Sequence, residues 1–229
     1  MKFFKNPHGC RMNKKPSLLY LVVIIAIGFS ACHGTVKEAN KNDTSTSSLS
    51  LHAGDDKYVA IDTKESVITW KGSSVGGAHT GYVYISKGEL MIENSKLMGG
   101  TVEVDMSTIE GDDHRSDNNL IKHLKDPDFF EVNKFPFSTI AIIKVTSINV
   151  EDNEITGNLT IKGITHPVTF PVNIEAQDGI VKASGRLVID RTKWDVRYKS
   201  GKFFDNLKDQ AISDSIEFLV KIVSKNTVN

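Results

Sequence analysis

The histidines His79, His114, His123 and His166 are the side chains of this sequence most suited to binding a metal ion. Transition-metal sites place their ligands at short, regular spacing, as in His-Glu-x-x-His. His114 has acidic neighbours, but it lies nine residues from His123, and no such pair is present. We therefore predict no metal site, and metal binding by His79, His114 and His123 stays an alternative. For His166, which precedes Pro167, we expect a hydrogen bond to the backbone.

Nucleophilic catalysis needs a serine or cysteine beside a base, with an oxyanion hole to receive the developing charge. The sequence contains many serine, histidine and aspartate residues, but their spacing does not indicate such an arrangement. The glycine-rich stretch from Gly72 to Gly81 is not followed by a helical pattern, so we do not expect it to bind a phosphate group. We predict that the chain is not an enzyme and uses no cofactor.

Cys32 is the residue whose chemistry the sequence defines best. The chain begins with a basic stretch that has no acidic residue, and an apolar run follows from Leu18 to Phe29. This run is shorter than the ~20 residues that a spanning helix needs, so it indicates a signal peptide. Ser30-Ala31-Cys32 resembles the lipobox of bacterial lipoproteins, whose cysteine is acylated after cleavage. We predict a signal peptide over residues 1–31 and a lipid on Cys32; the alternative is an ordinary secreted protein cut near Ala31.

The chain beyond the predicted signal peptide is acidic. Five of the 28 basic residues fall in that peptide and all 28 acidic residues lie beyond it, which leaves 23 against 28, a net charge of −5. No lysine- or arginine-rich block is present, so we exclude nucleic acid as a partner. Residues 32–57 are polar, and we predict a flexible tether there. One domain then follows at 58–225, with a disordered tail at 226–229.

Short runs rich in β-branched and aromatic residues fill the domain. They are separated by turn residues at 86–88, 151–153 and 177–179, which is typical of antiparallel hairpins in a sandwich or barrel. The last run alternates, so that one face of the strand is apolar and buried. That face consists of Ile216, Phe218, Val220 and Ile222.

One segment is predicted to be helical. Ser116 or Asp117 begins it as an N-cap, and Leu120, Ile121 and Leu124 recur at helical spacing. Asp126-Pro127 ends it, because a residue before proline avoids the helical conformation. A β domain with one short helix at one end indicates a barrel with a lid or plug.

Three segments resemble the YceI-like family in the right order and spacing. They are Asn118 to Pro136, Gly157 to Val168, and Asp190 to Val196. The resemblance runs from about Tyr58 to Val223. It departs from the family at residues 71–81, where the arginine of a Ser-Arg-His motif is missing and His79 fills the histidine position.

The resemblance implies an all-β fold, an antiparallel, eight-stranded, lipocalin-like barrel with one short α-helix near one end. Its lumen would bind a long apolar molecule such as a polyisoprenoid or an isoprenoid quinone. Family members are exported binding proteins and not enzymes. With Cys32 acylated, this chain would be a lipid-anchored carrier in the bacterial cell envelope, on the periplasmic or the surface side. The alternatives are an envelope interaction or scaffold module that uses the barrel loops, and a metal-binding envelope protein.

Aromatic side chains are the expected ligand contacts. The alternative is that they fill a closed core, since clusters of aromatic residues more often pack than bind. The predicted ligand-binding residues are Trp70, His79, Phe129, Phe130, Phe135, Phe137 and Trp194, and Phe203 and Phe204 are further aromatic candidates.

Overall fold

The computed structural model describes residues 49–225, except 53, 56, 95, 116, 117, 151 and 178. All of these residues belong to one compact unit, Asn42–Asn229. The predicted signal peptide, Cys32, most of the predicted tether and the tail at 226–229 lie outside the described residues. Where the chain is described, no helix combines the length and the apolar character needed to cross a membrane.

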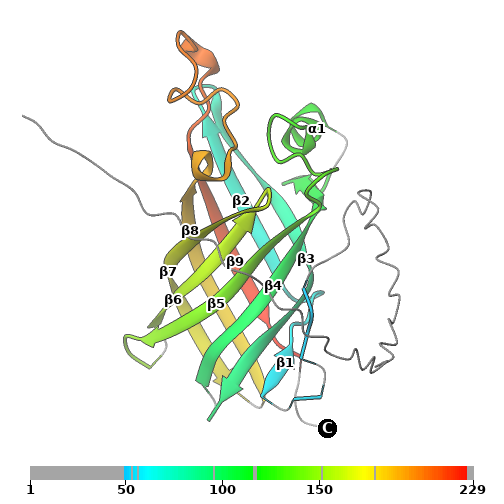
Figure 1. The fold of residues 1–229 in the computed structure, drawn as a ribbon, viewed down its shortest axis with the longest axis vertical. Helices are drawn as coiled ribbons and strands as arrows, with labels where there is room; N and C mark the ends of the chain where they lie inside the picture. The colour runs from blue at the N-terminus through cyan, green and yellow to red at the C-terminus, as the bar shows by residue number, and fades with distance from the viewer. Residues whose placement is uncertain are drawn as a thin grey trace, which may run out of the picture. The chain divides into compact units, whose positions relative to one another are not determined.

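Nine antiparallel strands form a single sheet, of which eight close into a barrel (Figure 1). Strands β2 to β9 are the closed set, because β3 pairs with β2 on one edge and with β4 on the other. The predicted eight-stranded antiparallel barrel with one short helix is therefore confirmed. The strands are β1 (Tyr58–Ala60), β2 (Val67–Ser74), β3 (Gly77–Glu93), β4 (Lys96–Gly111), β5 (Phe137–Ser147), β6 (Asp152–Ile161), β7 (Ile164–Gln177), β8 (Ile180–Asp190) and β9 (Ser215–Val223).

The short strand β1 follows the same edge of β3 as β2 does. It pairs with Glu89–Met91, whereas β2 pairs with Gly77–Val83. Between them, the Asp62 carboxylate accepts hydrogen bonds from the backbone N–H groups of Lys64 and Glu65. Such local bonds compete with the hydrogen bonds of a β-sheet and favour a turn. The strands β1 and β2 therefore occupy the same place in the barrel wall, one after the other, with a turn between them.

The turn predicted at Ser86-Lys87-Gly88 is wrong, because β3 runs straight through it. A register shift between Ile85 and Lys87 marks a β-bulge there. The Ser86 hydroxyl donates to the Glu103 carboxylate over 2.7 Å, which ties the bulge to β4. Glycine beside small polar residues also marks bulges, so sequence alone did not separate the two cases. The predicted hairpins near 151–153 and 177–179 are present between β5 and β6 and between β7 and β8.

Helix α1 (Asn119–Lys125) lies at one end of the barrel (Figure 1). Its N-cap is Asn118, whose side chain accepts a hydrogen bond from the Ile121 N–H over 2.9 Å. The predicted caps, Ser116 and Asp117, lie outside the described residues. Asp126 has extended backbone and ends the helix before Pro127, as predicted. The buried side chains of the helix are Ile121 and Leu124, so its apolar face covers the barrel end.

Gly81 allows Trp70 to lie flat against the wall between β3 and β4. A Cβ at Gly81 would stand 2.0 Å from the Glu110 carbonyl oxygen and 2.6 Å from Trp70 Cζ2. The Trp70 indole N–H donates to that same carbonyl over 3.2 Å. We expect Gly81→Ala to lower the free energy of unfolding by about 1–3 kcal/mol, because backbone and indole must both shift.

Urea unfolding measures this effect, and Gly72→Ala is its matched control. Gly72 lies on β2 of the same β2–β3 ladder, and a Cβ there meets no atom within 4 Å. We expect Gly72→Ala to leave stability nearly unchanged. Equal unfolding midpoints for the two variants would contradict the close approach at Gly81.

Candidate functional site

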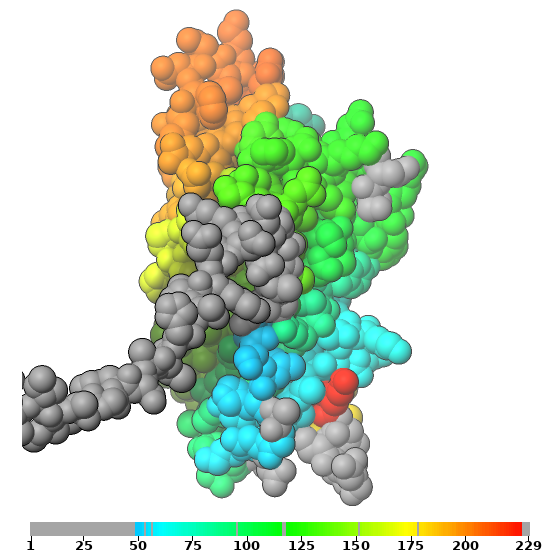
Figure 2. All heavy atoms as spheres, turned by 45° about the vertical axis from the view of Figure 1, so that its right-hand side comes forward, coloured from blue at the N-terminus to red at the C-terminus, as the bar shows by residue number. Residues whose placement is uncertain are grey.

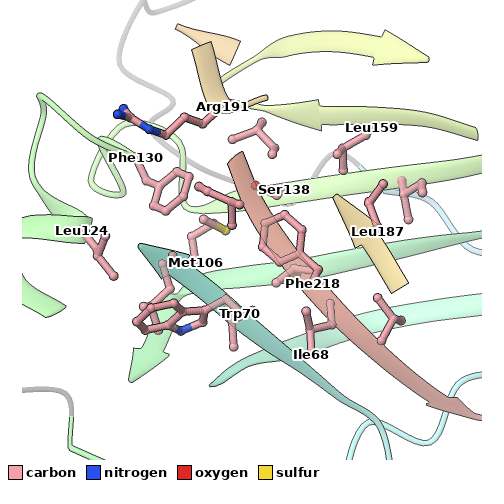
Figure 3. A pocket seen from close by; sticks show the side chains of 18 of the residues that line it. Ile68, Trp70, Met106, Leu124, Phe130, Ser138, Leu159, Leu187, Arg191 and Phe218 are labelled. Carbon is pink, nitrogen blue, oxygen red and sulfur yellow. The ribbon is translucent and has the colours of Figure 1, made fainter. Parts of the chain in front are cut away.

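The barrel encloses an apolar cavity of about 470 Å³ (Figure 3). Successive residues of a strand point to opposite faces, so each strand gives every second side chain to the interior. On β9 these side chains are the predicted apolar face, and all four of its members line the cavity. Further lining residues are Ile68, Val83, Leu90, Val102, Met106, Ile140, Ile155, Leu159, Phe170 and Leu187.

The size and lining of this cavity suit an apolar ligand. Its volume lies within the range of about 300–1,000 Å³ that small-molecule sites occupy. Each methylene group that moves from water to such surroundings contributes about 0.8 kcal/mol. A long hydrocarbon chain therefore needs few polar contacts to bind here.

Helix α1 and the segment that follows it form one wall at the end of the cavity. Leu120, His123 and Leu124 of α1 line it, as do Phe129 and Phe130. The rings of Phe129 and Phe130 meet edge to face, with centroids 5.0 Å apart. Both phenylalanines are buried, so this end of the cavity is walled by fixed aromatic rings.

The connection between β8 and β9 reaches the same end. It begins with a short 3-10 helix, η1 (Arg191–Trp194), and includes a second, η2 (Lys208–Gln210). In the space-filling view this segment (orange) stands beside the region of α1 (green) (Figure 2). Its contributions to the lining include Lys199, Asp209 and Ile212. The polar lining residues thus lie mainly at this end.

Arg191 holds this connection in place. Its side chain is 1% exposed, and its guanidinium donates to the carbonyl oxygens of Val196 (2.7 Å), Ser213 (2.9 Å) and Ile212 (3.1 Å). The Asp214 carboxylate lies 3.5 Å away. Burial lowers the pKa of Arg191, and the neighbouring carboxylates oppose this shift. Arg191 therefore has a structural role in the connection between β8 and β9.

Asp190 is the N-cap of η1. Its carboxylate accepts from the Thr192 N–H over 3.0 Å and from the Thr192 hydroxyl over 2.6 Å, and Lys202 pairs with it. Burial alone would raise the pKa of Asp190, but the hydrogen bonds from Lys202 and Thr192 outweigh it and lower that pKa to about 2. The carboxylate is therefore charged at neutral pH and has a structural role.

Four of the seven predicted ligand-binding residues line the cavity. They are Trp70, His79, Phe129 and Phe130. Trp70 is 8% exposed and lies on β2, whereas His79 is exposed and pairs with Gly72 near the tip of the β2–β3 hairpin. Binding by these residues stays a prediction, but their position agrees with it.

Phe135, Phe137 and Trp194 do not line the cavity, so the structure does not place them as predicted. Phe137 alternates with Ser138, and Ser138 is the residue of that pair that faces the interior. Trp194 is 2% exposed within η1, and its indole N–H donates to the Leu159 carbonyl over 3.1 Å. Phe135 precedes β5 and packs near Gly163. Phe203 and Phe204 are about half exposed, at 46% and 48%.

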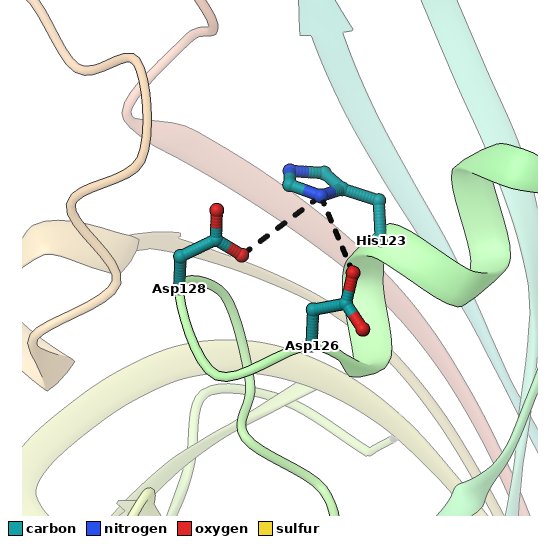
Figure 4. A group of neighbouring side chains, drawn as sticks. All are labelled: His123, Asp126 and Asp128. Atoms are coloured by element: carbon teal, nitrogen blue, oxygen red, sulfur yellow. Dashed lines mark ion pairs between the residues drawn. The ribbon is translucent and has the colours of Figure 1, made fainter.

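The histidines do not assemble as the metal alternative requires. Among the described residues, the one group of three potential ligands is His123 with Asp126 and Asp128, whose carboxylates each lie 3.8 Å from His123 Nδ1 (Figure 4). His114 instead pairs with Glu110 over 2.7 Å. His79 belongs to no such group in this part of the chain.

His166 forms the backbone hydrogen bond expected of it. Its Nε2 lies 2.9 Å from the Lys193 carbonyl oxygen, to which it donates. The ring also meets Trp194 edge to face, with centroids 5.1 Å apart. This histidine, which lies within β7, therefore connects η1 to that strand.

Residues 72–76 match the pattern Gly-x-Ser-x-Gly, in which the serine is Ser74. In hydrolases this pattern forms a strand–turn–helix elbow. Here it forms the turn of the β2–β3 hairpin, and the Ser74 hydroxyl accepts from the Gly76 N–H over 3.2 Å. Within the described residues no hydrogen bond joins Ser74 to His79, so the stretch has the geometry of a hairpin.

The chain has relatives among curated proteins. A family model described as the YceI-like domain matches residues 59–224. A UPF0312 protein of Shewanella denitrificans is 29% identical over 131 residues, which are 52% of this chain and 68% of that protein. A UPF0312 protein of Enterobacter sp. is 31% identical over 105 residues, which are 43% of this chain and 53% of that protein. The chain thus spans about half to two thirds of these relatives.

Solved structures share the fold. Burkholderia cenocepacia BcnA aligns with a TM-score of 0.60 and 17% identity, over 72% of this chain and 99% of that one. A polyisoprenoid binding domain from Saccharophagus degradans, implicated in plant cell wall breakdown, aligns with a TM-score of 0.54 and 10% identity, over 74% of this chain and 98% of that one. At these identities the likeness shows the barrel fold alone. Because the family model matches nearly the whole barrel, from β1 to the end of β9, this chain belongs to the YceI-like domain family.

Proposed function

We propose that this chain is a binding protein or carrier that holds a long apolar lipid of the isoprenoid type, such as a polyisoprenoid or an isoprenoid quinone. The observation that carries the proposal is the cavity of about 470 Å³, to which all eight strands of the barrel contribute side chains. Such a wall binds a prenyl chain through buried apolar area and needs no reacting group. The name of the Saccharophagus degradans domain, a polyisoprenoid binding domain, agrees with this ligand class.

The proposal includes a membrane anchor and a place in the bacterial cell envelope. Its basis is the predicted signal peptide over residues 1–31 and the predicted acylation of Cys32. Two or three acyl chains bind a membrane stably, whereas one is marginal. A tether over residues 32–57 would then keep the barrel near the membrane that supplies its ligand, on the periplasmic or the surface side.

Native mass spectrometry of the protein purified from its own host tests the proposal. We expect the spectrum to contain a complex with one hydrophobic molecule, which lipid extraction then releases for identification. A protein that carries no lipid, and that also takes up no prenyl lipid when one is offered, would rule the carrier function out.

Two alternatives give different results in the same preparation. An interaction module that uses its loops would lose function on a loop substitution while its lipid content stays unchanged. A metal-binding protein would contain stoichiometric zinc or iron in elemental analysis. Neither result is expected of a carrier, whose function and lipid content should fall together.

A further inference from the structure

Among the polar side chains that line the cavity, we single out two that have a polar atom without a hydrogen-bond partner in the described part of the chain. They are His123 on α1 and Ser138 at the start of β5. Ser138 is 7% exposed and lies among the lining residues (Figure 3), and among the described residues nothing bonds to its hydroxyl. Buried polar groups are nearly always paired, so both groups are candidates for contact with a ligand.

The two nitrogens of the His123 ring have different surroundings. Nδ1 faces the carboxylates of Asp126 and Asp128, each 3.8 Å away (Figure 4). Nε2, at the opposite edge of the ring, is buried and has no hydrogen-bond partner among the described residues. Leaving such a group unpaired costs about 1–3 kcal/mol. A ligand atom that bonds to Nε2 would recover that energy.

Neighbouring rings fix the direction in which Nε2 points. The imidazole packs against Tyr198 at a centroid distance of 4.2 Å and against Phe129 at 6.0 Å. The Phe129 ring in turn lies under the Arg191 guanidinium, 5.5 Å from its centroid. Packing therefore holds the His123 ring in one orientation, which favours a specific contact between Nε2 and a ligand.

The charges around this end of the cavity do not suit an anionic head group. The two lining cations are Arg191 and Lys199, and the lining anion is Asp209. Arg191 already donates to three carbonyl oxygens and faces Asp214, so most of its donors and its charge are paired within the protein. Without Arg191, the charged lining residues are one cation, Lys199, and one anion, Asp209. Asp126 and Asp128 beside His123 add further negative charge.

We propose that His123 and Ser138 bind the head of the lipid, and that this head is uncharged and carries an oxygen. A carbonyl oxygen would accept from Nε2–H when the ring proton is on that nitrogen, or from the Ser138 hydroxyl. A hydroxyl would donate to Nε2 when the ring proton is on Nδ1, beside the two carboxylates. The shared chemistry is a prenyl alcohol or an isoprenoid quinone, as opposed to a prenyl pyrophosphate. This inference rests on the proposed carrier function.

Competition between lipids of equal chain length tests the inference. The purified protein receives equimolar pairs drawn from geranylgeraniol, menaquinone with four isoprene units, geranylgeranyl pyrophosphate and the hydrocarbon phytane, and native mass spectrometry reads the bound fractions. We expect the alcohol, the quinone or both to bind about tenfold better than the pyrophosphate. Direct competition between the alcohol and the quinone shows which uncharged head group the protein prefers.

Substitutions at His123 separate its role in binding from its role in packing. His123→Phe keeps the ring contacts, and we expect it to lose about tenfold in affinity for the preferred uncharged head and nothing for phytane. Glutamine places a polar atom near the position of Nε2, whereas asparagine reaches only as far as Nδ1. His123→Gln should therefore retain binding that His123→Asn loses. His114→Phe, outside the lining, is the control.

The outcomes distinguish this inference from the carrier function. If none of the four lipids binds, the carrier function itself is wrong. If they bind, but the pyrophosphate matches the uncharged heads or His123→Phe binds all of them as the parent protein does, the head-group assignment is overturned and the carrier function stands. Ser138→Ala is a second test, and we expect it to cause a smaller loss of affinity for the same lipid.

Discussion

Replacing Arg191 by methionine is expected to lower the free energy of unfolding by about 3–5 kcal/mol. Methionine fills much of the same space but donates no hydrogen bond. The carbonyl oxygens of Val196, Ile212 and Ser213 would then lose their donor. Asp214 would lose one of its two ion-pair partners and keep Lys202, 3.5 Å away. Each unpaired buried group costs about 1–3 kcal/mol, which accounts for an effect of this size.

Arg186→Met is the matched control for this experiment. Arg186 lies on β8, the strand that ends directly before Arg191, but its side chain is 59% exposed and pairs with Glu217 on the surface. Exposed ion pairs contribute about 0–1 kcal/mol, so this variant should unfold close to the parent protein. Chemical denaturation of the three proteins side by side gives the comparison. Similar losses for both variants would show that the buried guanidinium has no special role.

The loss of the Arg191 guanidinium should also affect the residues that line the cavity. The carbonyl groups that Arg191 holds belong to the connection between β8 and β9, which lines the cavity through Lys199, Asp209 and Ile212. Amide hydrogen exchange of residues 196–214 should therefore rise more in Arg191→Met than in Arg186→Met. Exchange confined to β8 would contradict this link.

Replacing Trp70 by arginine is expected to weaken prenyl lipid binding by about a hundredfold or more. Trp70 is 8% exposed, lines the cavity, and lies close to Gly81 and the Glu110 carbonyl. A guanidinium at this position would lie against aliphatic and aromatic side chains, and a buried charge without a partner costs several kcal/mol. A hundredfold loss corresponds to about 2.8 kcal/mol, which is well within that cost. Titration with menaquinone of four isoprene units measures it.

Thr69→Arg provides the control one position along the strand. Thr69 lies on the opposite face of β2, outside the cavity lining, so the same new charge would face away from the ligand. We expect its lipid affinity to match that of the parent protein. Circular dichroism shows whether Trp70→Arg is folded, and Ile68→Arg, at a half-buried lining position, repeats the test if it is not. Full binding by folded Trp70→Arg would contradict a ligand in this cavity.

Much of the fold could be predicted from local patterns. The alternation of Ile216, Phe218, Val220 and Ile222 indicated which face of β9 is buried, because a strand has a period of two. The end of α1 followed from Pro127, since that constraint is local. The bulge at Ser86 could not be distinguished from a turn, because both use small polar residues and only pairing with β4 decides between them.

The candidate site was less accessible to prediction. Trp70, Phe129 and Phe130 were expected to contact a ligand and do line the cavity, whereas Phe137 and Trp194 do not. Aromatic character alone does not show on which face of the barrel wall a ring lies. The signal that sequence reasoning missed was strand parity in β5, which places Ser138 inside and Phe137 outside once the register of the strand is known.

The family, the antiparallel strands and the single helix could be inferred from the sequence alone, because each depends on neighbouring residues or on ordered motifs. The lipid anchor at Cys32 stays a prediction. The folded structure was needed to show that the barrel encloses a cavity, since that depends on how side chains from eight strands fill a shared space. It also decided the roles of Arg191 and His123. Their partners come from distant parts of the chain, and long-range contacts of this kind arise only when the barrel closes.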